Sequence, residues 1–492
     1  MIKTAFLEIL RTFNKDELKR FEAFLNSPYF NTRNNVVNLF SVVKKYTPEF
    51  SHKILDKEEI WKNIFPEKEY NYGILKNIIY DITKLAEKFL EVEYMNSNQK
   101  QQMNNLLTKL GEKQLDGIFI NKYNAFEKIL FNSSKYYPDY FQDYMELKDH
   151  RYLLSVYNPK YILKSGAIEI SELFIFDFIA KFGTNFNNVY IEESELNQSS
   201  ETEFIRLFSE AVFSDKKLEE YIDKMNNGPE KNYRILKIFF KMMKCYLNPQ
   251  SISFYFEFKN TLFENDKYIT ESALRRLYAS LGSTLDNCNV AYDINKNREL
   301  YNIIFQLVEK NIFLSEDGKA IPSLYLLAVK TSGYLKETLF IEKLRKEFLH
   351  KLDTTLQENF KIFSLAYLHY SKNEFDKALE FSNKISIDKF QLKYFLKNLQ
   401  IIISFEKNDY EMFLFLNDTH KHFLAKNKSV SQSYKESNMK FLNYTNSLFK
   451  LKESSDLPEI EFTEKSIIND VVVNKQWLLE KLKEMDKKKS DN

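Results

Sequence analysis

The sequence predicts an all-α protein, and three observations support this prediction. Glycine and proline are scarce, with 9 of each in 492 residues, whereas glycine alone usually makes up about 7% of a protein. Apolar residues recur at helical spacing along most of the chain. One helix–turn–helix pattern occurs twice near the C-terminus. Sheets and hairpins need glycine at turns with positive φ, and helix pairs need far less of it.

Residues 1–95 show the pattern of a helical bundle. Asn14 with Glu17 three residues later forms a capping-box pattern at the start of a helix. Asp56 and Glu59 repeat this spacing before another short apolar run. A long amphipathic helix then closes the bundle, and we expect its apolar face to cover the other helices.

The stretch "FEAFLNSPYFNTRNN" places two aromatic residues, Tyr29 and Phe30, in a turn that follows Pro28. Two interpretations are open. The rings can cover the open end of the bundle core, or they can form an edge that recognises a partner. Each ring buries roughly 150–250 Å² when enclosed, and leaving both in water would create an adhesive patch. We therefore expect both rings to plug the core.

Helical patterns continue beyond the polar stretch 96–105, which is either a linker or an exposed helix surface. Two further stretches, 157–170 and 182–196, lack a clear helical pattern and could be long loops. From these breaks we expect four ranges: an N-terminal helical bundle (1–95), an irregular helical region (106–230), a helix-pair array (231–452) and a C-terminal extension with a flexible tail (453–492).

An internal repeat joins two helical patterns in the array. "YSKNEFD" is followed 35 residues later by "FEKNDYE". Asn373 and Asn408 lie at the same place in the two copies, where an asparagine can adopt the left-handed conformation that ends a helix. Phe375 and Tyr410 come two residues later, and we expect them to pack back against the preceding helix.

"SLAYLHYSKNEFDKALEFSNKI" resembles a tetratricopeptide repeat, with its best match over residues 357–425. Ala366 and Ala378 stand at the small positions of the two helices, whereas the next copy has Ile401 and Phe413 there. "KTSGYLKETLFIEKL" is a weaker third candidate. The resemblance implies a stack of helix pairs whose concave face binds a peptide or protein. The "FLNSPYFN" module joined to such repeats also resembles a family of bacterial proteins, and this second resemblance implies no function.

The charges are almost balanced, with 71 Lys and Arg, 69 Asp and Glu and a net charge of +2. This balance gives no overall field to attract nucleic acid or anionic lipid. Arg234, Lys237, Lys241 and Lys244 nevertheless recur at helical spacing and form a basic stripe. The stripe is either part of a nucleic-acid surface or the solvated face of an ordinary helix, and we expect the ordinary face.

Compartment and membrane association follow from the same composition. The apolar start "MIKTAFLEILRTF" is interrupted by Glu8 and Arg11, unlike a signal peptide. No run of about 18 uninterrupted apolar residues predicts a membrane span. Two distant cysteines, Cys245 and Cys288, do not form a disulfide framework and are expected to be core thiols. We expect a cytoplasmic protein.

No pattern indicates a catalytic, cofactor or metal site. The nine glycines are scattered singly, so there is no glycine-rich phosphate loop. His420 and His422 should point to different faces of a helix, and His52, His150 and His350 have no ligand-spaced partner. The remaining histidine, which lies in "YLHY" of the best repeat, is expected to pack or face solvent, with contact to a bound partner as the alternative.

We therefore expect a non-enzymatic interaction or scaffold protein, without cofactor, that binds a peptide or protein in a helical-repeat groove. The alternative is a nucleic-acid-associated regulatory protein that uses the basic stripe. An enzyme ranks third, because no pattern in the sequence names a reaction.

Overall fold

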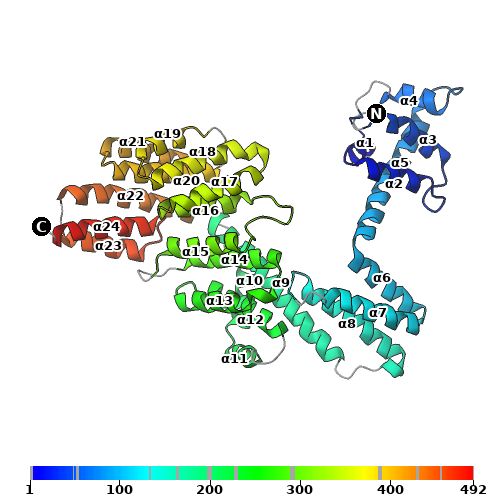
Figure 1. The fold of residues 1–492 in the computed structure, drawn as a ribbon, viewed down its shortest axis with the longest axis horizontal. Helices are drawn as coiled ribbons and strands as arrows, with labels where there is room; N and C mark the ends of the chain where they lie inside the picture. Colours follow the sequence, from blue (N-terminus) through cyan, green and yellow to red (C-terminus); the bar gives the residue numbers. More distant parts are fainter. Residues whose placement is uncertain are drawn as a thin grey trace. The chain divides into compact units, whose positions relative to one another are not determined.

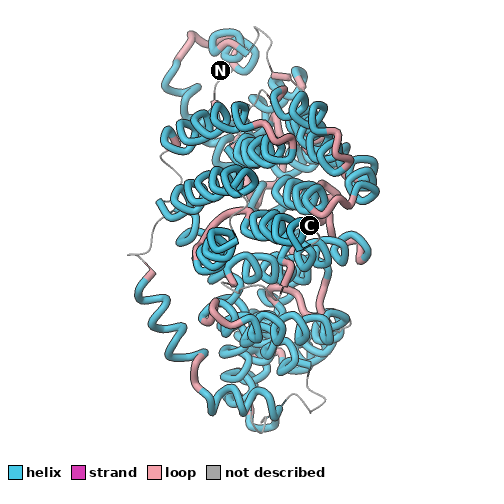
Figure 2. Tube along the Cα trace, turned by 90° about the vertical axis from the view of Figure 1, so that its left-hand side faces the viewer, coloured by secondary structure: helices cyan, strands magenta, loops and turns pink. Residues whose placement is uncertain are grey.

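The computed structural model of the chain is built from α-helices joined by short connections (Figures 1 and 2). The structure describes residues 4–47, 49–50, 55–131, 135–161, 166–196, 202–225, 231–288, 294–385, 390–427, 432–454 and 457–490. Over these ranges it contains no β-strand, and the only β-type contacts are two isolated bridges. The all-α prediction is confirmed. His52, which the sequence analysis considered as a possible metal ligand, lies outside the described residues.

The chain divides into two compact units. The first unit comprises Met1–Ile129 and Asp149–Leu163, and the second comprises Leu130–Lys148 and Lys164–Asn492. The divisions fall near the end of α7 (Asp116–Phe131) and inside α8 (Tyr140–Tyr157). The four ranges expected from the sequence stay a prediction. The other helices of the first unit are α1 (Ala5–Leu10), α2 (Lys15–Leu25), α3 (Asn34–Val43), η1 (Lys44–Tyr46), α4 (Lys57–Ile64), α5 (Tyr72–Ser97), α6 (Gln99–Glu112) and η3 (Pro159–Tyr161).

Aromatic rings fill the centre of the N-terminal bundle in the first unit. The ring of Phe21 on α2 contacts Phe13, Phe40 and Phe89, with centroids 5.7, 5.1 and 5.2 Å apart. Tilted and edge-on ring pairs at these distances are the favourable aromatic arrangements. The three partners come from the α1–α2 connection, α3 and α5, so this cluster holds the bundle together.

Polar caps fix where two of these helices begin. The Asn14 side chain accepts a hydrogen bond from the Glu17 N–H at 2.9 Å, and the Glu17 carboxylate accepts one from the Asn14 N–H at 2.7 Å. The first predicted capping box is therefore confirmed. Asp56 also caps its helix, by accepting from the Lys57 N–H, but Glu59 pairs with Lys62 instead of reaching back. A cation three residues away competes for that carboxylate, so the second prediction is half right.

The turn that contains the two aromatic residues places them differently. Phe30 stacks on Phe24 with centroids 4.2 Å apart and packs against the core, whereas Tyr29 is 88% exposed. The N–H groups of Phe30 and Asn31 both donate to the Ser27 carbonyl. This tight turn directs one ring inward and its neighbour outward. The plug prediction is right for Phe30 and wrong for Tyr29.

The polar stretch 96–105 is helical on both sides of Asn98. The Asn98 side chain accepts a hydrogen bond from the Gln101 N–H at 3.0 Å and so begins α6 directly after α5 ends. An exposed helix surface, one of the two alternatives, therefore describes this stretch.

The second unit has one continuous hydrophobic core that extends from Tyr136 to Leu482. Its last helix joins this core through Trp477, whose ring lies 5.4 Å from that of Phe405. The helices of this unit are α9 (Gly166–Leu196), α10 (Glu203–Phe213), α11 (Lys216–Met225), α12 (Lys231–Leu247), α13 (Ile252–Asn265), η4 (Asp266–Tyr268), α14 (Glu271–Asn287), α15 (Lys296–Glu309), α16 (Pro322–Tyr334), α17 (Thr338–Glu347), η5 (Leu349–Lys351), α18 (Thr354–Ser371), α19 (Phe375–Asn383), α20 (Phe390–Glu406), α21 (Tyr410–Lys426), α22 (Gln432–Ser454), α23 (Leu457–Asn469) and α24 (Lys475–Ser490).

Three helix pairs, α16–α17, α18–α19 and α20–α21, are joined by turns of the same geometry. Lys336, Asn373 and Asn408 lie at equivalent places and have φ of 59°, 59° and 57°. In the middle turn the N–H of Glu374 donates to the carbonyl of His369 at 2.9 Å, and the other two turns have the same bond at the same length. This is the pattern of a Schellman helix end. The left-handed conformation predicted at both asparagines is confirmed.

The aromatic residues that follow two of these turns behave differently. Phe375 contacts Tyr370 of the preceding helix, with ring centroids 6.1 Å apart, as predicted. Tyr410 instead packs on Phe449 of α22 at 5.2 Å and donates a hydrogen bond to Asn446. Where the first pair has a small residue, the next has Phe413, which fills that space, so Tyr410 finds its partner on the following helix.

The stretch 182–196, which the sequence left as a possible loop, is the second half of α9. Gly183 does not end the helix. A Cβ at this position would lie 2.9 Å from Met242 Cε and 3.4 Å from Phe239 Cδ1, so the glycine permits close packing on α12. Phe186, one turn later, is buried in the core. Tertiary packing thus outweighs the low helix propensity of glycine and asparagine.

Candidate binding cleft of the second unit

Two helices of the second unit present polar residues to a common cleft. On α9 these residues are Lys181, Thr184, Asn185 and Asn188. Their spacing of three, four and seven residues places all four on one helix face. Three of them lie in the stretch that showed no helical pattern in the sequence, which is why the sequence did not indicate them.

The facing wall comes from α14 and has the same spacing. Ala273, Arg276, Leu277 and Ser280 line the cleft, again at intervals of three, four and seven residues. Apolar and polar positions alternate along this wall, so it offers both a contact surface and hydrogen-bonding groups. The α9 and α14 faces together therefore offer both polar and apolar contacts to the cleft.

The floor of the cleft is apolar. Phe239 and Met242 of α12 form it, together with Ala180 of α9 and the ring of Tyr136. All four are almost fully buried. The cleft has a volume of about 230 Å³, which is below the roughly 300–1,000 Å³ of typical small-molecule sites. It accommodates one or two side chains more readily than a whole cofactor.

A short backbone contact holds one end of the cleft in place. The Tyr136 N–H donates to the Tyr268 carbonyl at 2.6 Å, and the Thr270 N–H donates to the Tyr136 carbonyl at 2.8 Å. These bonds form an isolated parallel bridge just before α14 begins. They bring Tyr136 and the exposed Asp139 to the end of both walls. Burial raises the pKa of Tyr136, so its phenol remains protonated.

The two cations of the cleft are held differently. Lys181 forms an ion pair with Asp177 at 3.1 Å and donates to Gln142. Arg276 is exposed and forms neither a hydrogen bond nor an ion pair with any described residue. Its guanidinium, which has five N–H donors, is therefore available to an incoming carboxylate or carbonyl.

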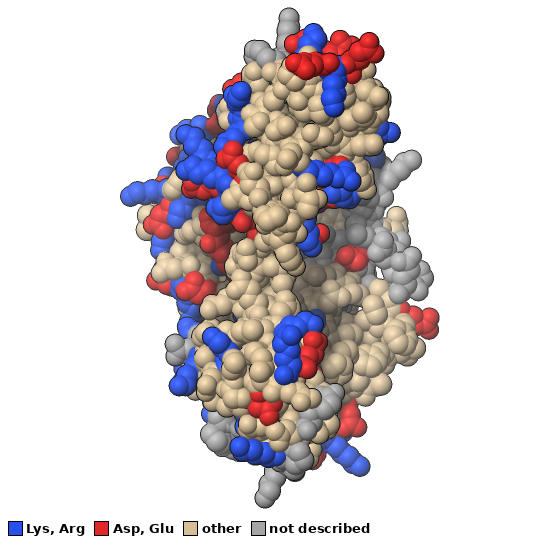
Figure 3. Space-filling view, turned by 90° about the vertical axis from the view of Figure 1, so that its right-hand side faces the viewer, with Lys and Arg blue, Asp and Glu red and all other residues tan. Residues whose placement is uncertain are grey.

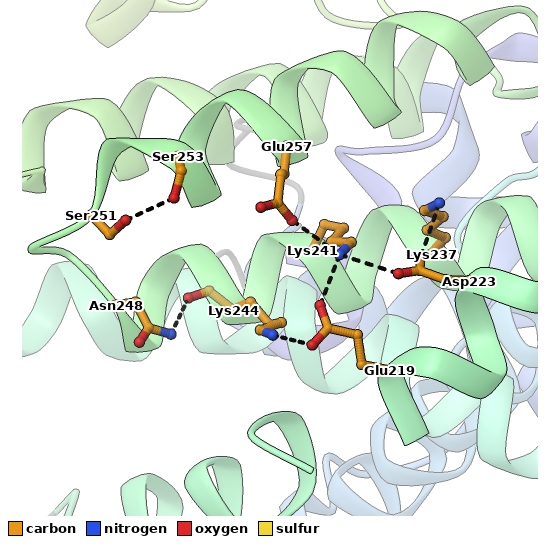
Figure 4. Close-up of polar contacts among 9 residues, drawn as sticks. All are labelled: Glu219, Asp223, Lys237, Lys241, Lys244, Asn248, Ser251, Ser253 and Glu257. Atoms are coloured by element: carbon orange, nitrogen blue, oxygen red, sulfur yellow. Dashed lines mark hydrogen bonds and ion pairs between the residues drawn. The ribbon is translucent and has the colours of Figure 1, made fainter. Parts of the chain in front are cut away.

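The basic stripe predicted on α12 is not a solvated surface. Lys241 lies against Glu219 at 2.8 Å and Glu257 at 3.0 Å, and Lys237 lies 2.9 Å from Asp223 (Figure 4). Lys244 also pairs with Glu219, and Arg234 stacks on the ring of Tyr268. The acidic partners come from α11 and α13, the helices that flank α12.

These contacts shift the pKa values of Glu219 and Lys241. Burial disfavours the charged form of each group, but the hydrogen bonds from Lys241 and Lys244 hold the pKa of Glu219 below its usual value. Glu219 and Glu257 likewise outweigh burial and raise the pKa of Lys241.

Elsewhere on the surface, Lys and Arg lie interspersed with Asp and Glu on the face shown in Figure 3. The nucleic-acid alternative stays a prediction, now without the free basic stripe that motivated it.

The histidines singled out in the sequence are separated in space. His369 shares a hydrogen bond of 2.6 Å with Glu374 and stacks on Phe381. His420 is fully buried and His422 is exposed, so the prediction that they face different ways is confirmed. No group of three or more His, Cys, Asp or Glu able to hold a metal ion occurs among the residues that the structure describes.

The two cysteines, which lie 43 residues apart in the sequence, are both buried in the core of the second unit, as predicted.

No protein-family model, curated protein or solved structure matches the chain. Among the described residues, no helix is both long and apolar enough to cross a membrane.

Proposed function

We propose that the chain is a non-enzymatic interaction protein that holds a segment of a partner protein in the α9–α14 cleft of its second unit. The observation that carries the proposal is the pair of helix faces, each lined at intervals of three, four and seven residues. They enclose an apolar floor and present hydrogen-bonding side chains, among them Arg276, which forms no hydrogen bond or ion pair with any residue that the structure describes.

The chemistry of the walls suits a peptide. Asn185 and Asn188 are exposed and each offers both a carbonyl acceptor and an amide donor. Such side chains can satisfy the N–H and C=O groups of a bound backbone. The apolar floor takes a side chain, and Arg276 takes a carboxylate or a backbone carbonyl. We therefore propose a segment that carries an apolar anchor next to an acidic residue.

The helix pairs of the second unit support a tetratricopeptide-like arrangement. The side chain of Lys336 donates to Asn373 at 2.7 Å, so the turn of one pair is linked to the turn of the next. Lys372 forms an ion pair with Glu342 and so links the same two helix pairs. In the best-matching pair the small residues Ala366 and Ala378 are fully buried, as close helix packing requires. We propose that these pairs form a continuous stack that supports the cleft.

A selection of peptides tests the proposal. A heptapeptide phage library is selected on the full-length chain, and the enriched peptides are measured by fluorescence anisotropy. We expect enriched peptides to combine an apolar and an acidic residue. Replacing Arg276 with alanine should weaken them about 10- to 100-fold, because a hydrogen bond to a charged group contributes about 1.5–3 kcal/mol.

Lys346→Ala provides the matched control, because Lys346 is an exposed cation of α17 outside the cleft. It should leave every affinity unchanged. Asn185→Ala should weaken peptides of different sequence by similar factors, since it removes backbone recognition. Failure to enrich any peptide, or equal binding by Arg276→Ala and Lys346→Ala, would contradict the proposal.

A further inference from the structure

Two helices of the second unit, α9 and α10, expose large apolar side chains to solvent. Phe204 of α10 is 78% exposed, and Phe174 of α9 is 61% exposed. Three further apolar residues of the same helices are also exposed. We name this surface the α9–α10 patch, and it consists of Phe174, Ile175, Phe178, Phe204 and Leu207.

A ring contact joins the two halves of the patch. The ring of Phe178 on α9 lies edge-on to the ring of Phe208 on α10, with centroids 5.7 Å apart. Phe174 lies one turn before Phe178, and Phe204 lies one turn before Phe208. Residues four apart share a helix face, so the exposed rings of both helices adjoin at this contact and form one surface.

The patch is not the side through which α10 packs on the core. Ser209 and Phe213 of α10 are fully buried, and the ring of Phe213 lies 5.5 Å from that of Phe240 on α12. Helical spacing places Phe204 and Leu207 on the opposite side of α10. A surface helix normally carries one apolar stripe, and a helix that is apolar on several sides is normally covered on each of them.

The area of the patch fits an interface between two copies of this chain. At roughly 200 Å² for a whole phenylalanine side chain, the three rings expose about 350 Å², and the two aliphatic residues raise the patch to about 500 Å². A standard interface buries about 800 Å² on each partner, of which about 65% is apolar in homodimers. The patch therefore supplies about the apolar area that such a dimer requires.

We propose that the α9–α10 patch is a two-fold interface that joins two copies of the chain into a homodimer. In a two-fold interface the same surface of both copies is buried, so each patch meets an apolar surface of equal size. The net charge of the chain is only +2, and two copies therefore repel each other little. The proposal does not depend on which ligand the cleft binds.

Sedimentation equilibrium of the full-length chain tests the proposal. Between about 1 and about 200 μM we expect a monomer–dimer equilibrium with a Kd of about 10 μM or below. Phe204→Asp should raise this Kd at least about 100-fold, because a two-fold interface contains the substitution twice and each carboxylate would be buried against an apolar surface. Phe174→Asp should do the same from the other helix. Both side chains are largely exposed in the single chain, so neither substitution removes a core contact.

Phe415→Asp is the matched control. Phe415 lies on α21 outside the patch and is 69% exposed, so the same substitution there should leave the Kd within about twofold. Circular dichroism during urea unfolding checks that all three variants fold. A wild type that stays monomeric at the highest concentration would overturn the proposal and leave the patch to a different protein. Association that continues beyond the dimer, an unchanged Kd in both patch variants, or equal weakening by Phe415→Asp would overturn it as well.

Discussion

Replacing Gly333 with alanine tests the packing of α16 on α18 directly. A Cβ at this position would lie 2.5 Å from Tyr367 Cδ1, 3.2 Å from its Cγ and 3.1 Å from its Cβ. Rotation of the Tyr367 ring can relieve the first of these contacts. It cannot relieve the last, because the Cβ of Tyr367 is fixed to the backbone of α18. The two helices must therefore move apart in the variant.

The expected magnitude follows from two opposing effects. Overpacking of a core costs about 1–3 kcal/mol, and contacts this short in a residue pair without exposed surface place the cost at the upper end. Alanine in place of glycine gains at most about 1 kcal/mol of helix propensity. Gly333→Ala should therefore lower the free energy of unfolding of the second unit by about 2 kcal/mol.

Gly282→Ala is the matched control. Gly282 is also helical and in the same unit, but a Cβ there would lie 3.6 Å from Leu300 Cδ1, an ordinary contact. It should raise stability by up to about 1 kcal/mol, because only the propensity term applies. Urea unfolding of both variants, followed by circular dichroism, gives the comparison. If both variants were stabilised equally, the described contact between α16 and α18 would be wrong.

Two further pairs of substitutions test the N-terminal bundle and a buried histidine. Phe30→Ala should lower the unfolding midpoint of the first unit by the equivalent of about 2 kcal/mol, whereas Tyr29→Ala should stay within about 0.5 kcal/mol; equal effects would contradict the inward and outward placement of the rings. Burial lowers the pKa of His420 from 6.5 to about 3. Between pH 6.5 and pH 3 the unfolded chain therefore binds a proton at this histidine that the folded chain does not. The contribution of the neutral histidine to the free energy of unfolding is fully present above pH 6.5 and decreases as the pH falls. Urea unfolding of the wild type should show that the free energy of unfolding falls by about 2 kcal/mol between pH 6.5 and pH 5. His420→Phe should remove this pH dependence, and His350→Gln, at an exposed position, should retain it. The same pH dependence in His420→Phe would refute the assignment.

The turns that join the helix pairs could be predicted because their cause is local. A helix end needs a residue that tolerates positive φ, and asparagine is one of the few that does. Asn373 and Asn408 therefore allowed their turns to be predicted from the sequence. Lys336 adopts the same left-handed conformation, but a lysine in the sequence does not predict a positive φ. The turn at Lys336 therefore appeared in the sequence only as a weaker match to the repeat.

The wall of the cleft on α9 could not be predicted, because its cause is not local. Gly183 and the asparagines near it cost roughly 2–3 kcal/mol of helix propensity relative to alanine. Burial of the rings of Phe182 and Phe186 against the core offsets this cost, at roughly 1.5–3 kcal/mol for each ring when fully enclosed. The propensity term can be read from neighbouring residues, but the burial term depends on helices that come later in the chain.

The role of the basic stripe on α12 also could not be predicted from neighbouring residues, because it depends on acidic residues of other helices. Lys241 is almost fully buried, and a buried ammonium is tolerated only when carboxylates surround it. Those carboxylates, Glu219 and Glu257, precede and follow it by 22 and 16 residues, on separate helices. A row of lysines at helical spacing therefore has two physical outcomes: it attracts phosphate where neighbouring helices leave it uncovered, and it binds those helices together where they supply acids. In this chain α11 and α13 supply the acids, so the stripe acts as a polar link inside the second unit.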